Sequence, residues 1–397
     1  MKKIKVFECF AGIGTQRMAL RNLGVNFQSV GISEIDIPAI LSYSAIHDNL
    51  SSTEIEYPTK EEMIEFLTTK NIGFNFKSKK VTLPKQLDKL KQLYKATILS
   101  NCYGDVSLLN PSELADFDLF TYSFPCQDLS IAGLTGGMLR NQTRSGLLYE
   151  CEKIIEVKRP KYLLLENVKN LVGKQFKSQF EEWLNYLETL GYTNYWKVLN
   201  AKHYGVPQNR ERVFVVSILG DHKPYEFPQP TTTVHKIKDI LQSKVEDKYY
   251  INKPFKLVDK GYQAELLNTP YEQAARVYSE YNVMKTLCTR GDNNILVCAK
   301  VDGLNNQTSR VFNVNGICST LDTMQGGYRE PKILTENDFR VRKLTPLECW
   351  RLMGVSDDDY NKVKQIGMSN SQLYKQAGNA IVVNVLEHIF KNLFDED

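Results

Sequence analysis

The sequence lacks the cysteine pattern of a zinc site or of a disulfide-stapled domain. Its eight cysteines are scattered over 397 residues, with no Cys-x-x-Cys pair and no cluster of cysteine with histidine. Structural zinc sites and disulfide frameworks are both recognised by such clustering. We therefore expect reduced thiols, no bound metal and a cytoplasmic location.

Long apolar runs and a strong net charge are also missing. No stretch is long and apolar enough to cross a bilayer, and the Met-Lys-Lys start leads into an expected strand and not into a signal sequence. The formal net charge of +4 permits nucleic-acid binding without indicating it. With 42% hydrophobic and 24% charged residues, the composition is that of a globular protein. The length suits two domains, and no membrane contact is expected.

A glycine turn follows the first expected strand. Residues 4–10 alternate as in a strand, residues 11–14 hold two glycines, and a helix is expected to open at Gln16. Glycines in this place let a ligand approach the backbone at the positive end of the helix. Arg17 stands where the dinucleotide motif Gly-x-Gly-x-x-Gly has its third glycine, so a tight turn without a ligand remains the alternative.

Carboxylates follow at two later positions. A second expected strand, residues 27–32, leads to Glu34, and a carboxylate there suits a ribose diol, although it could equally cap a helix or face solvent. Asp105, which follows Gly104, could meet an adenine amino group or close an ordinary turn. From these residues alone, the nucleoside could belong to NAD or to S-adenosylmethionine.

One thiol is expected at the end of a buried strand. Residues 117–120 (Phe-Asp-Leu-Phe) are apolar enough to form a buried strand, and Pro125 ends the run because proline cannot donate to a sheet ladder. Cys126 is therefore expected at the carboxyl end of a strand, where ligands collect in an open α/β sheet. By residue type alone, a small buried hydrophobe is a commoner role for a cysteine than a nucleophile.

Charged residues occur in two further expected strands. Residues 161–168 form a buried strand that contains Glu166, whose carboxyl group must face a polar cleft or carry a proton. Residues 208–216 form another strand with Arg210 and Arg212 at its head, and one of these arginines could point into the same cleft.

The order of these blocks resembles that of the DNA cytosine-5 methyltransferases of the bacterial restriction-modification type. The blocks are residues 10–14 (Phe-Ala-Gly-Ile-Gly), 125–127 (Pro-Cys-Gln), 166–168 (Glu-Asn-Val), 208–212 (Gln-Asn-Arg-Glu-Arg), 342–349 (Arg-Lys-Leu-Thr-Pro-Leu-Glu-Cys) and 378–381 (Gly-Asn-Ala-Ile). The resemblance covers nearly the whole chain. The long insert between Asp48 and Cys102 is similar to that of the CpG-type enzymes of mollicutes.

The resemblance implies a fold and a reaction. The fold is α/β, a Rossmann-like S-adenosylmethionine-dependent methyltransferase with a mixed, mostly parallel sheet and a smaller target-recognition domain. Cys126 would add to carbon 6 of a cytosine flipped out of duplex DNA, so that carbon 5 can take the methyl group of S-adenosylmethionine and S-adenosylhomocysteine is left. Glu166 would stabilise ring N3 and Arg212 would hold O2, with Arg210 as a further catalytic candidate.

The resemblance also assigns binding residues. Cofactor contacts are expected at Phe10, Gly12, Ile13, Gly14, Glu34, Ile35, Asp105, Val106, Pro125, Leu147, Asn379 and Ile381. DNA contacts are expected at Ser130, Arg144, Gln307, Arg310 and Thr320.

Three segments are expected along the chain. Residues 1–224 would form the catalytic and cofactor-binding domain, residues 225–335 the target-recognition domain, and residues 336–397 a segment that returns to the catalytic domain. Residues 221–340 hold 16 Lys or Arg against 15 Asp or Glu and are rich in Tyr, Asn and Gln. Such a composition suits the reading of base edges better than the neutralisation of phosphates.

Two further segments, the insert and the C-terminal helices, have patterns of their own. The insert at about residues 51–101 has helical periodicity and is expected to be a solvated helical appendage, with DNA contacts as the alternative. The block at 378–381 is expected to open a last helix that runs to Phe394, and Cys349 is expected in the core.

Double-stranded DNA is the expected partner of a monomeric enzyme in a bacterial or phage-infected cytoplasm, with a cognate restriction endonuclease if the enzyme belongs to a restriction pair. An RNA (tRNA) cytosine-5 methyltransferase would share the catalytic blocks, and the long recognition region stands against it. A catalytically idle DNA-binding protein is disfavoured by the intact Cys126, Glu166 and Arg212. An NAD-dependent redox enzyme is disfavoured by the missing third glycine.

Overall fold

This computed structural model describes residues 3–76, 78–125, 145–233, 235–253, 255–257, 297–335 and 340–394. Three residues that the sequence singles out, Cys126, Ser130 and Arg144, lie outside the described residues. Within the described ranges, none of the helices is both long and apolar enough to cross a membrane.

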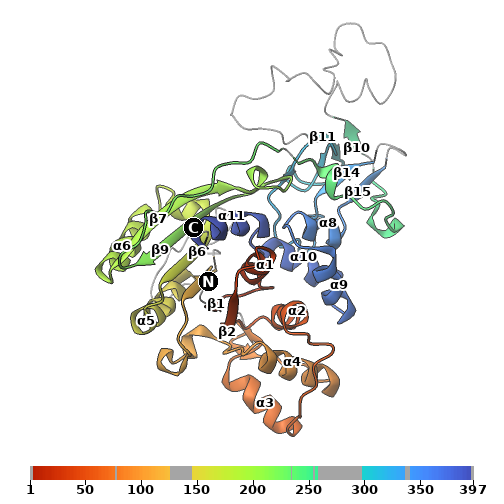
Figure 1. Cartoon of the computed structure of the whole chain (residues 1–397). Coiled ribbons are helices and arrows are strands. Elements are labelled where there is room, and N and C mark those ends of the chain that lie inside the picture. The colour runs from red at the N-terminus through yellow and green to blue at the C-terminus, as the bar shows by residue number, and fades with distance from the viewer. Residues whose placement is uncertain are drawn as a thin grey trace.

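The larger lobe is built on a mixed sheet (Figure 1). Among the described residues six strands form it, in the order β2 (Phe27–Ser33), β1 (Ile4–Cys9), β5 (Leu119–Tyr122), β6 (Tyr162–Val168), β9 (Glu211–Leu219) and β7 (Tyr192–Asn200). The pairs from β2 to β6 are parallel, and β9 runs antiparallel to both of its neighbours. The expected α/β fold with a mixed, mostly parallel sheet is confirmed. The chain connects β1 first to β2 on one side and then to β5 on the other side. A crevice is therefore expected beyond the carboxyl ends of β1 and β5.

Alternate residues of the strands enter two hydrophobic cores, because successive side chains of a strand point to opposite faces. On one face, Val6 and Leu164 pack with residues of α1 (Thr15–Asn22) and α11 (Val383–Phe394). On the other face, the neighbouring strand residues pack with α5 (Leu148–Lys158) and α6 (Lys177–Thr189); these residues are Phe7, Leu163 and Leu165. Helices therefore cover both faces of the sheet, so a cavity can open only at the ends of its strands.

The insert is not a solvated appendage, so that expectation is wrong. It contains α3 (Lys60–Thr69), the short antiparallel pair β3 (Phe74–Asn75) and β4 (Lys80–Val81), and α4 (Leu87–Leu99). Its periodic apolar residues are fully buried in the main core, namely Met63, Leu67, Leu90 and Leu93. The physical reason is the packing of α4 against α2 (Ile37–His47), which gives the apolar stripe a partner.

A smaller sheet lies at the other end of the molecule from the insert helices (Figure 1). In the described part of the chain it has five strands, in the order β10 (Phe255–Leu257), β11 (Val297–Val301), β12 (Arg310–Phe312), β14 (Lys332–Leu334) and β15 (Val341–Lys343). It has a hydrophobic cluster of its own, formed by Cys298, Ala299, Val301, Val311, Leu334 and Val341. The sheet crosses the boundary expected at residue 335, because β15 belongs to it.

The two lobes share further contacts. The start of the expected recognition segment packs into the main core through Tyr225, Phe227 and Ile237. Residues 318–319, which form β13 (Cys318–Ser319), pair in parallel with β8 (Gln208–Asn209). The expected strand at 208–216 is thus divided at Arg210, with β8 on one side and β9 on the other.

The C-terminal segment adds α8 (Pro346–Arg351), α9 (Asp357–Gln365) and α10 (Asn370–Asn379) ahead of α11. The expectation that residues 378–381 open the last helix is wrong, since Gly378 and Asn379 end α10 and α11 begins at Val383. A side chain at 378 would collide with the Asp322 carbonyl, so the glycine permits a close approach of two chain segments. Cys349 is fully buried in the core, as expected.

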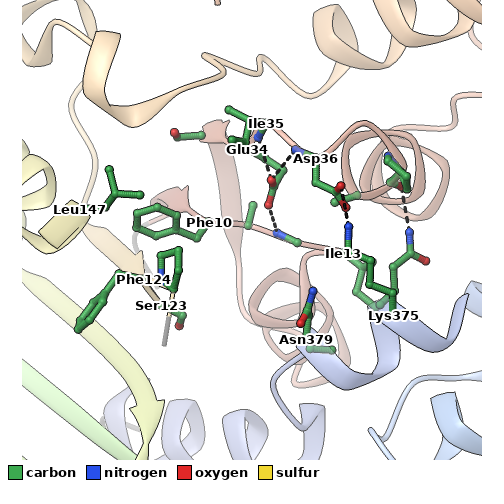
Figure 2. Close-up of a pocket in the computed structure, with 18 of the residues that line it drawn as sticks. Phe10, Ile13, Glu34, Ile35, Asp36, Ser123, Phe124, Leu147, Lys375 and Asn379 are labelled. Carbon is green, nitrogen blue, oxygen red and sulfur yellow. Dashed lines mark hydrogen bonds and ion pairs between the residues drawn. The ribbon is translucent and has the colours of Figure 1, made fainter. Parts of the chain in front are cut away.

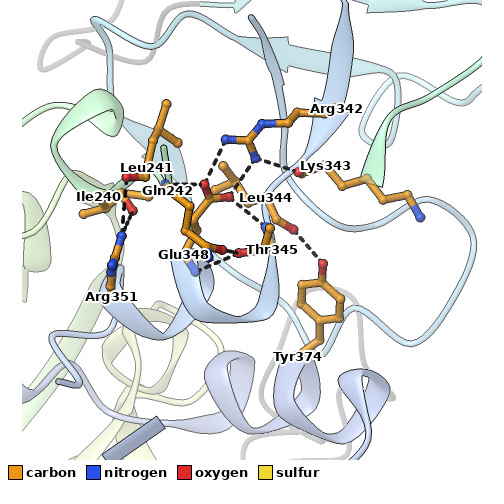
Figure 3. Close-up of polar contacts among 10 residues, drawn as sticks. All are labelled: Ile240, Leu241, Gln242, Arg342, Lys343, Leu344, Thr345, Glu348, Arg351 and Tyr374. Atoms are coloured by element: carbon orange, nitrogen blue, oxygen red, sulfur yellow. Dashed lines mark hydrogen bonds and ion pairs between the residues drawn. The ribbon is translucent and has the colours of Figure 1, made fainter. Parts of the chain in front are cut away.

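A buried ion pair joins the smaller sheet to α8 (Figure 3). The Arg342 guanidinium donates to both oxygens of Glu348 at 2.8 Å, in a bidentate arrangement. The backbone N–H groups of Gln242 and Thr345 donate to the same carboxylate, also at 2.8 Å. Since Arg342 is 2% exposed and Glu348 0%, each charge depends on the other for its partner.

Candidate active site

A cavity of about 680 Å³ opens at the carboxyl ends of the parallel strands. Figure 2 shows Phe10 and Leu147 on one side of it, Glu34 and Ile35 at its end, and Asn379 opposite. The predicted cofactor residues on its wall are Phe10, Gly12, Ile13, Glu34, Ile35, Asp105, Val106, Pro125, Leu147, Asn379 and Ile381. Residues from both ends of the chain therefore meet in one cavity, whose volume suits a nucleoside-sized ligand together with a base.

The turn after β1 has the left-handed backbone that its glycines suggest. Gly12 has φ of 56° and Gly14 has φ of 74°, and Phe10 adopts φ of 56° although it has a side chain. The Phe10 N–H donates to the Ser33 carbonyl at 2.8 Å, which ties the turn to the end of β2. A non-glycine residue with positive φ is uncommon and is found where the surroundings hold it, as at functional sites.

Gly14 is the exception among the predicted cofactor residues. Gly14 does not line the cavity that the described residues form. A side chain at this position would collide with His47 and Tyr43 of α2. The structure therefore gives Gly14 a packing role between α1 and α2, and the cofactor contact at Gly14 remains a prediction.

Glu34 organises the end of the cavity. Its Oε1 accepts the N–H groups of Ile35 and Asp36 at 2.8 Å, and its Oε2 accepts the N–H of Gly12 at 3.0 Å (Figure 2). Burial and the nearby Asp36 carboxylate raise the pKa of Glu34, while the three N–H donors act in the opposite direction. A carboxylate has about four lone-pair sites, so one remains for a ligand hydroxyl.

Asp105 lies on the same wall and is already hydrogen-bonded. Its Oδ1 accepts from the N–H and hydroxyl of Ser107, and its Oδ2 accepts from the Asn71 side-chain amide at 3.0 Å. Asp105 thus caps a short 3-10 turn, Val106–Leu108, and the turn places Val106 on the cavity wall. Because Asn71 belongs to the insert, the insert contacts this wall directly.

Glu166 and Arg212 form an ion pair on the cavity wall. They lie on the neighbouring antiparallel strands β6 and β9, and the Nε of Arg212 is 3.2 Å from Oε1 of Glu166. Glu166 is 8% exposed, and burial raises its pKa although Arg212 and then Arg210 lower it. The pair offers a carboxyl group that retains a proton more readily than usual, beside a fixed positive charge.

Asn167, in the block 166–168, has a role in the structure that the sequence did not assign to it. Its side-chain amide donates to the Phe124 carbonyl at 3.1 Å, and it is 2% exposed. This bond holds the end of β5 against β6 just before Pro125, from which the chain continues to Cys126. Asn167 directly follows Glu166 in an apolar strand, and a buried side-chain amide needs a hydrogen-bond partner. This position was the sequence signal that could have identified it.

Arg210 also lines the cavity, but its guanidinium is engaged by backbone. It donates to the carbonyls of Leu321, Gly378 and Ala380 at 3.0–3.1 Å, and it is 4% exposed. These carbonyls belong to segments far apart in the sequence, so Arg210 braces the C-terminal part of the cavity. Its predicted catalytic role remains a prediction, and the contacts favour Arg212 as the group that faces a base.

The cavity lining among the described residues does not include Gln307, Arg310 or Thr320, although Thr320 lies beside it. Gln307 and Arg310 are exposed, at the loop before β12 and at its start. Thr320 is exposed as well, and its hydroxyl donates to the Asn209 carbonyl at 2.7 Å, next to Arg210.

Other residues of the cavity wall were not anticipated. On the C-terminal side Lys375 pairs with Asp36 at 2.8 Å (Figure 2), and on the insert side the wall includes Gly73, Phe74, Asn75, Phe76 and Thr82. No local pattern marks them, because they reach the cavity through contacts between segments that are far apart in the sequence.

Comparisons with known proteins agree with this geometry. The family model for C-5 cytosine-specific DNA methylase matches residues 62–395. The chain is 41% identical to Type II methyltransferase M2.ScrFI of Lactococcus lactis subsp. cremoris, over 98% of this chain and 99% of that protein. It is 34% identical to Orphan methyltransferase M.SssI of Spiroplasma monobiae, over 99% of this chain and 97% of that protein.

A likeness to solved structures extends to the fold alone. The crystal structure of the S. pombe Dnmt2 methyltransferase matches with a TM-score of 0.60 at 16% sequence identity, over 98% of both chains.

The family implies S-adenosylmethionine as the methyl donor and DNA as the substrate. The RNA methyltransferase and the catalytically idle DNA-binding protein are not favoured by these matches. The chain belongs to the C-5 cytosine-specific DNA methylase family and is a DNA cytosine-5 methyltransferase.

Proposed function

We propose that this enzyme methylates a cytosine flipped out of duplex DNA, with Cys126 as the nucleophile and Glu166 and Arg212 as the groups that hold the base. The observation that carries the proposal is the Glu166–Arg212 pair on the cavity wall, beside the strand end that leads to Cys126. Ring N3 and O2 lie on one edge of cytosine. A protonated carboxyl group next to a cation matches that edge.

The roles follow from the chemistry of the ring. The Cys126 thiolate would form a bond to carbon 6, which removes the aromaticity and moves electron density toward carbon 5 and N3. Glu166 would donate a hydrogen bond to N3 where that charge develops, and Arg212 would donate to O2. S-adenosylmethionine, when bound, supplies the methyl group. Loss of the carbon-5 proton and breakage of the carbon–sulfur bond would restore the ring and the thiolate.

The cavity residues fit this methyl donor. Glu34 retains a lone-pair site for a ribose hydroxyl, and the left-handed turn at Phe10 and Gly12 opens the backbone to a ligand. Asn379 and Ile381 line the opposite side, where the family resemblance places the methionine part.

The direct test is methyl transfer from labelled S-adenosylmethionine to duplex DNA and, in parallel, to tRNA. We expect label in DNA alone, and bisulfite sequencing of DNA from an expressing host should then show the methylated site. Label in tRNA with none in DNA would overturn the proposed substrate.

The ribose contact gives a second test. Glu34→Ala should weaken S-adenosylmethionine binding by about 1–3 kcal/mol, the usual contribution of charge-assisted hydrogen bonds. Isothermal titration calorimetry measures the change. Glu62→Ala is the matched control, because Glu62 caps α3 outside the cavity and its removal should leave the dissociation constant unchanged. Equal affinities for the wild type and Glu34→Ala would remove Glu34 from the cofactor site.

We also propose that the smaller lobe reads the DNA sequence, since its sheet has a core of its own and exposes Arg310. Exchanging residues 250–343 for those of another family member should move the methylated sequence to the donor's target, because the catalytic pair lies on the other sheet. Arg310→Ala should reduce discrimination between sites more than cofactor affinity. An active chimera that still methylates the original target would place recognition elsewhere.

For the assembly, we propose a monomer that acts on double-stranded DNA in a bacterial or phage-infected cytoplasm. A cognate restriction endonuclease would recognise the same site if the enzyme is the protective half of a pair. Assaying extracts of the source cell for cleavage of unmethylated DNA tests for such an endonuclease.

A further inference from the structure

The insert reaches the cavity through a short hairpin, residues 73–82, which we call the insert hairpin. Its strands β3 and β4 pair in antiparallel register, with Phe74 opposite Val81. Five residues of the hairpin line the cavity: Gly73, Phe74, Asn75 and Phe76 in and around β3, and Thr82 directly after β4. The hairpin is therefore part of the cavity wall.

One end of the insert hairpin is bonded to Ile35. The Gly73 N–H donates to the Ile35 carbonyl at 2.8 Å, and the Gly73 carbonyl accepts the N–H of Thr82 at 3.0 Å. Gly73 has φ of 81°, and a Cβ there would lie 2.6 Å from the Thr82 carbonyl oxygen and 2.9 Å from Ile37. The close approach of the hairpin to this wall thus requires a glycine.

The chain just before the hairpin is bonded to the wall that carries Asp105. The Asp105 N–H donates to the Lys70 carbonyl at 2.9 Å, and the Asn71 amide donates to the Asp105 carboxylate at 3.0 Å. A side chain at Gly104 would collide with the backbone of Lys70. Contacts from the insert therefore hold two residues of the expected adenosine end, Ile35 and Asp105.

The insert hairpin presents aromatic rings to the cavity. Phe74 and Phe76 are two positions apart, and their ring centroids lie 5.3 Å apart at an interplanar angle of 83°. Both rings are only partly buried, and both residues line the cavity. Partly exposed aromatic rings gain free energy when a flat apolar surface covers them, and a purine is such a surface.

We propose that the insert hairpin is a wall of the cofactor site, and that Phe74 and Phe76 contact the adenosine part of S-adenosylmethionine. The insert would then serve cofactor affinity and not DNA binding. This inference rests on the proposed function in one respect, namely that the cavity binds S-adenosylmethionine.

The test compares variants of the full-length enzyme. Phe74→Ala combined with Phe76→Ala should raise the dissociation constant for S-adenosylhomocysteine and the KM for S-adenosylmethionine about tenfold or more. The kcat at saturating cofactor and the KM for DNA should stay at wild-type values. Tyr57→Ala is the matched control, because Tyr57 is an insert aromatic that is 39% exposed and outside the cavity wall.

A reporter variant covers the case in which the double variant does not fold. Phe76→Trp places a fluorophore at this wall, and its fluorescence should change when adenosine or S-adenosylhomocysteine is added but not when methionine is added. No fluorescence response from a variant that calorimetry shows to bind S-adenosylhomocysteine would overturn the proposal.

The outcomes separate the inference from the function on which it rests. If the wild type fails to bind S-adenosylmethionine, the proposed cofactor site is wrong. If the wild type binds it and the folded double variant binds equally well, the proposed hairpin contact alone is wrong. A rise in the KM for DNA without a change in cofactor affinity would instead make the insert a DNA-binding element.

Discussion

Cys126→Ser is expected to lower methyl transfer by about three orders of magnitude or more, while cofactor binding and the melting temperature remain close to those of the wild type. The thiolate is the nucleophile in the proposed reaction, and a free cysteine with a pKa of about 8.5 is far more ionised near neutral pH than a serine hydroxyl. Losing a covalent nucleophile removes the step on which all later steps depend. Transfer of labelled methyl groups to duplex DNA measures the loss.

A covalent adduct gives an independent readout of the same step. DNA that contains 5-fluorocytosine should trap the wild type in a complex that survives denaturing electrophoresis, because fluorine cannot leave as a proton does. The Ser variant should form no such complex. Cys298→Ser is the matched control: its thiol is buried against the Val311 carbonyl at 3.6 Å, where a hydroxyl can also donate. Near-native turnover in Cys126→Ser, or no adduct from an active wild type, would contradict the mechanism.

Arg342→Ala is expected to lower the free energy of unfolding by about 3–5 kcal/mol, which is the usual cost of leaving one partner of a buried ion pair without the other. The Glu348 carboxylate would keep the N–H groups of Gln242 and Thr345 but would lose both guanidinium bonds. Because the pair joins β15 of the smaller sheet to α8, the sheet should loosen from the larger lobe as well. Denaturant unfolding measures the loss, and the melting temperature should fall with it.

Two variants sharpen this prediction. Lys153→Ala removes an ion pair in which the lysine is 57% exposed, and it should cost no more than about 1 kcal/mol. Replacing both partners, as Arg342→Met with Glu348→Leu, should recover much of the stability because no buried charge is left unpaired. If Arg342→Ala costs no more than Lys153→Ala, the buried pair is not an important brace between the lobes.

Local patterns were enough to predict the turn and the buried carboxyl group at the strand ends of this enzyme. Glycines after a first strand indicated the turn at Phe10 and Gly12, and a glutamate in an apolar strand indicated a carboxyl group at a cleft. These inferences depend on strand alternation and turn chemistry within a few residues, which a sequence displays directly. The side chains of Glu166 and Arg212 meet because their strands are neighbours in the sheet, which the family resemblance supplied.

The rest was decided by contacts between segments far apart in the chain. Gly14 carries the same local signal as Gly12, but α2 packs over it, and Gly378 lies in the last turn of α10 where the Asp322 carbonyl leaves no room for a side chain. The insert has the amphipathic pattern of a solvated helix pair, and the packing of α4 against α2 and of α3 against α4 buries it. An apolar stripe shows that a residue needs a partner but does not show which surface provides it. The sequence by itself therefore determined the glycine turn and the buried carboxyl group at the strand ends, and the tertiary structure decided which distant residues, such as Phe74 and Phe76, complete the cavity.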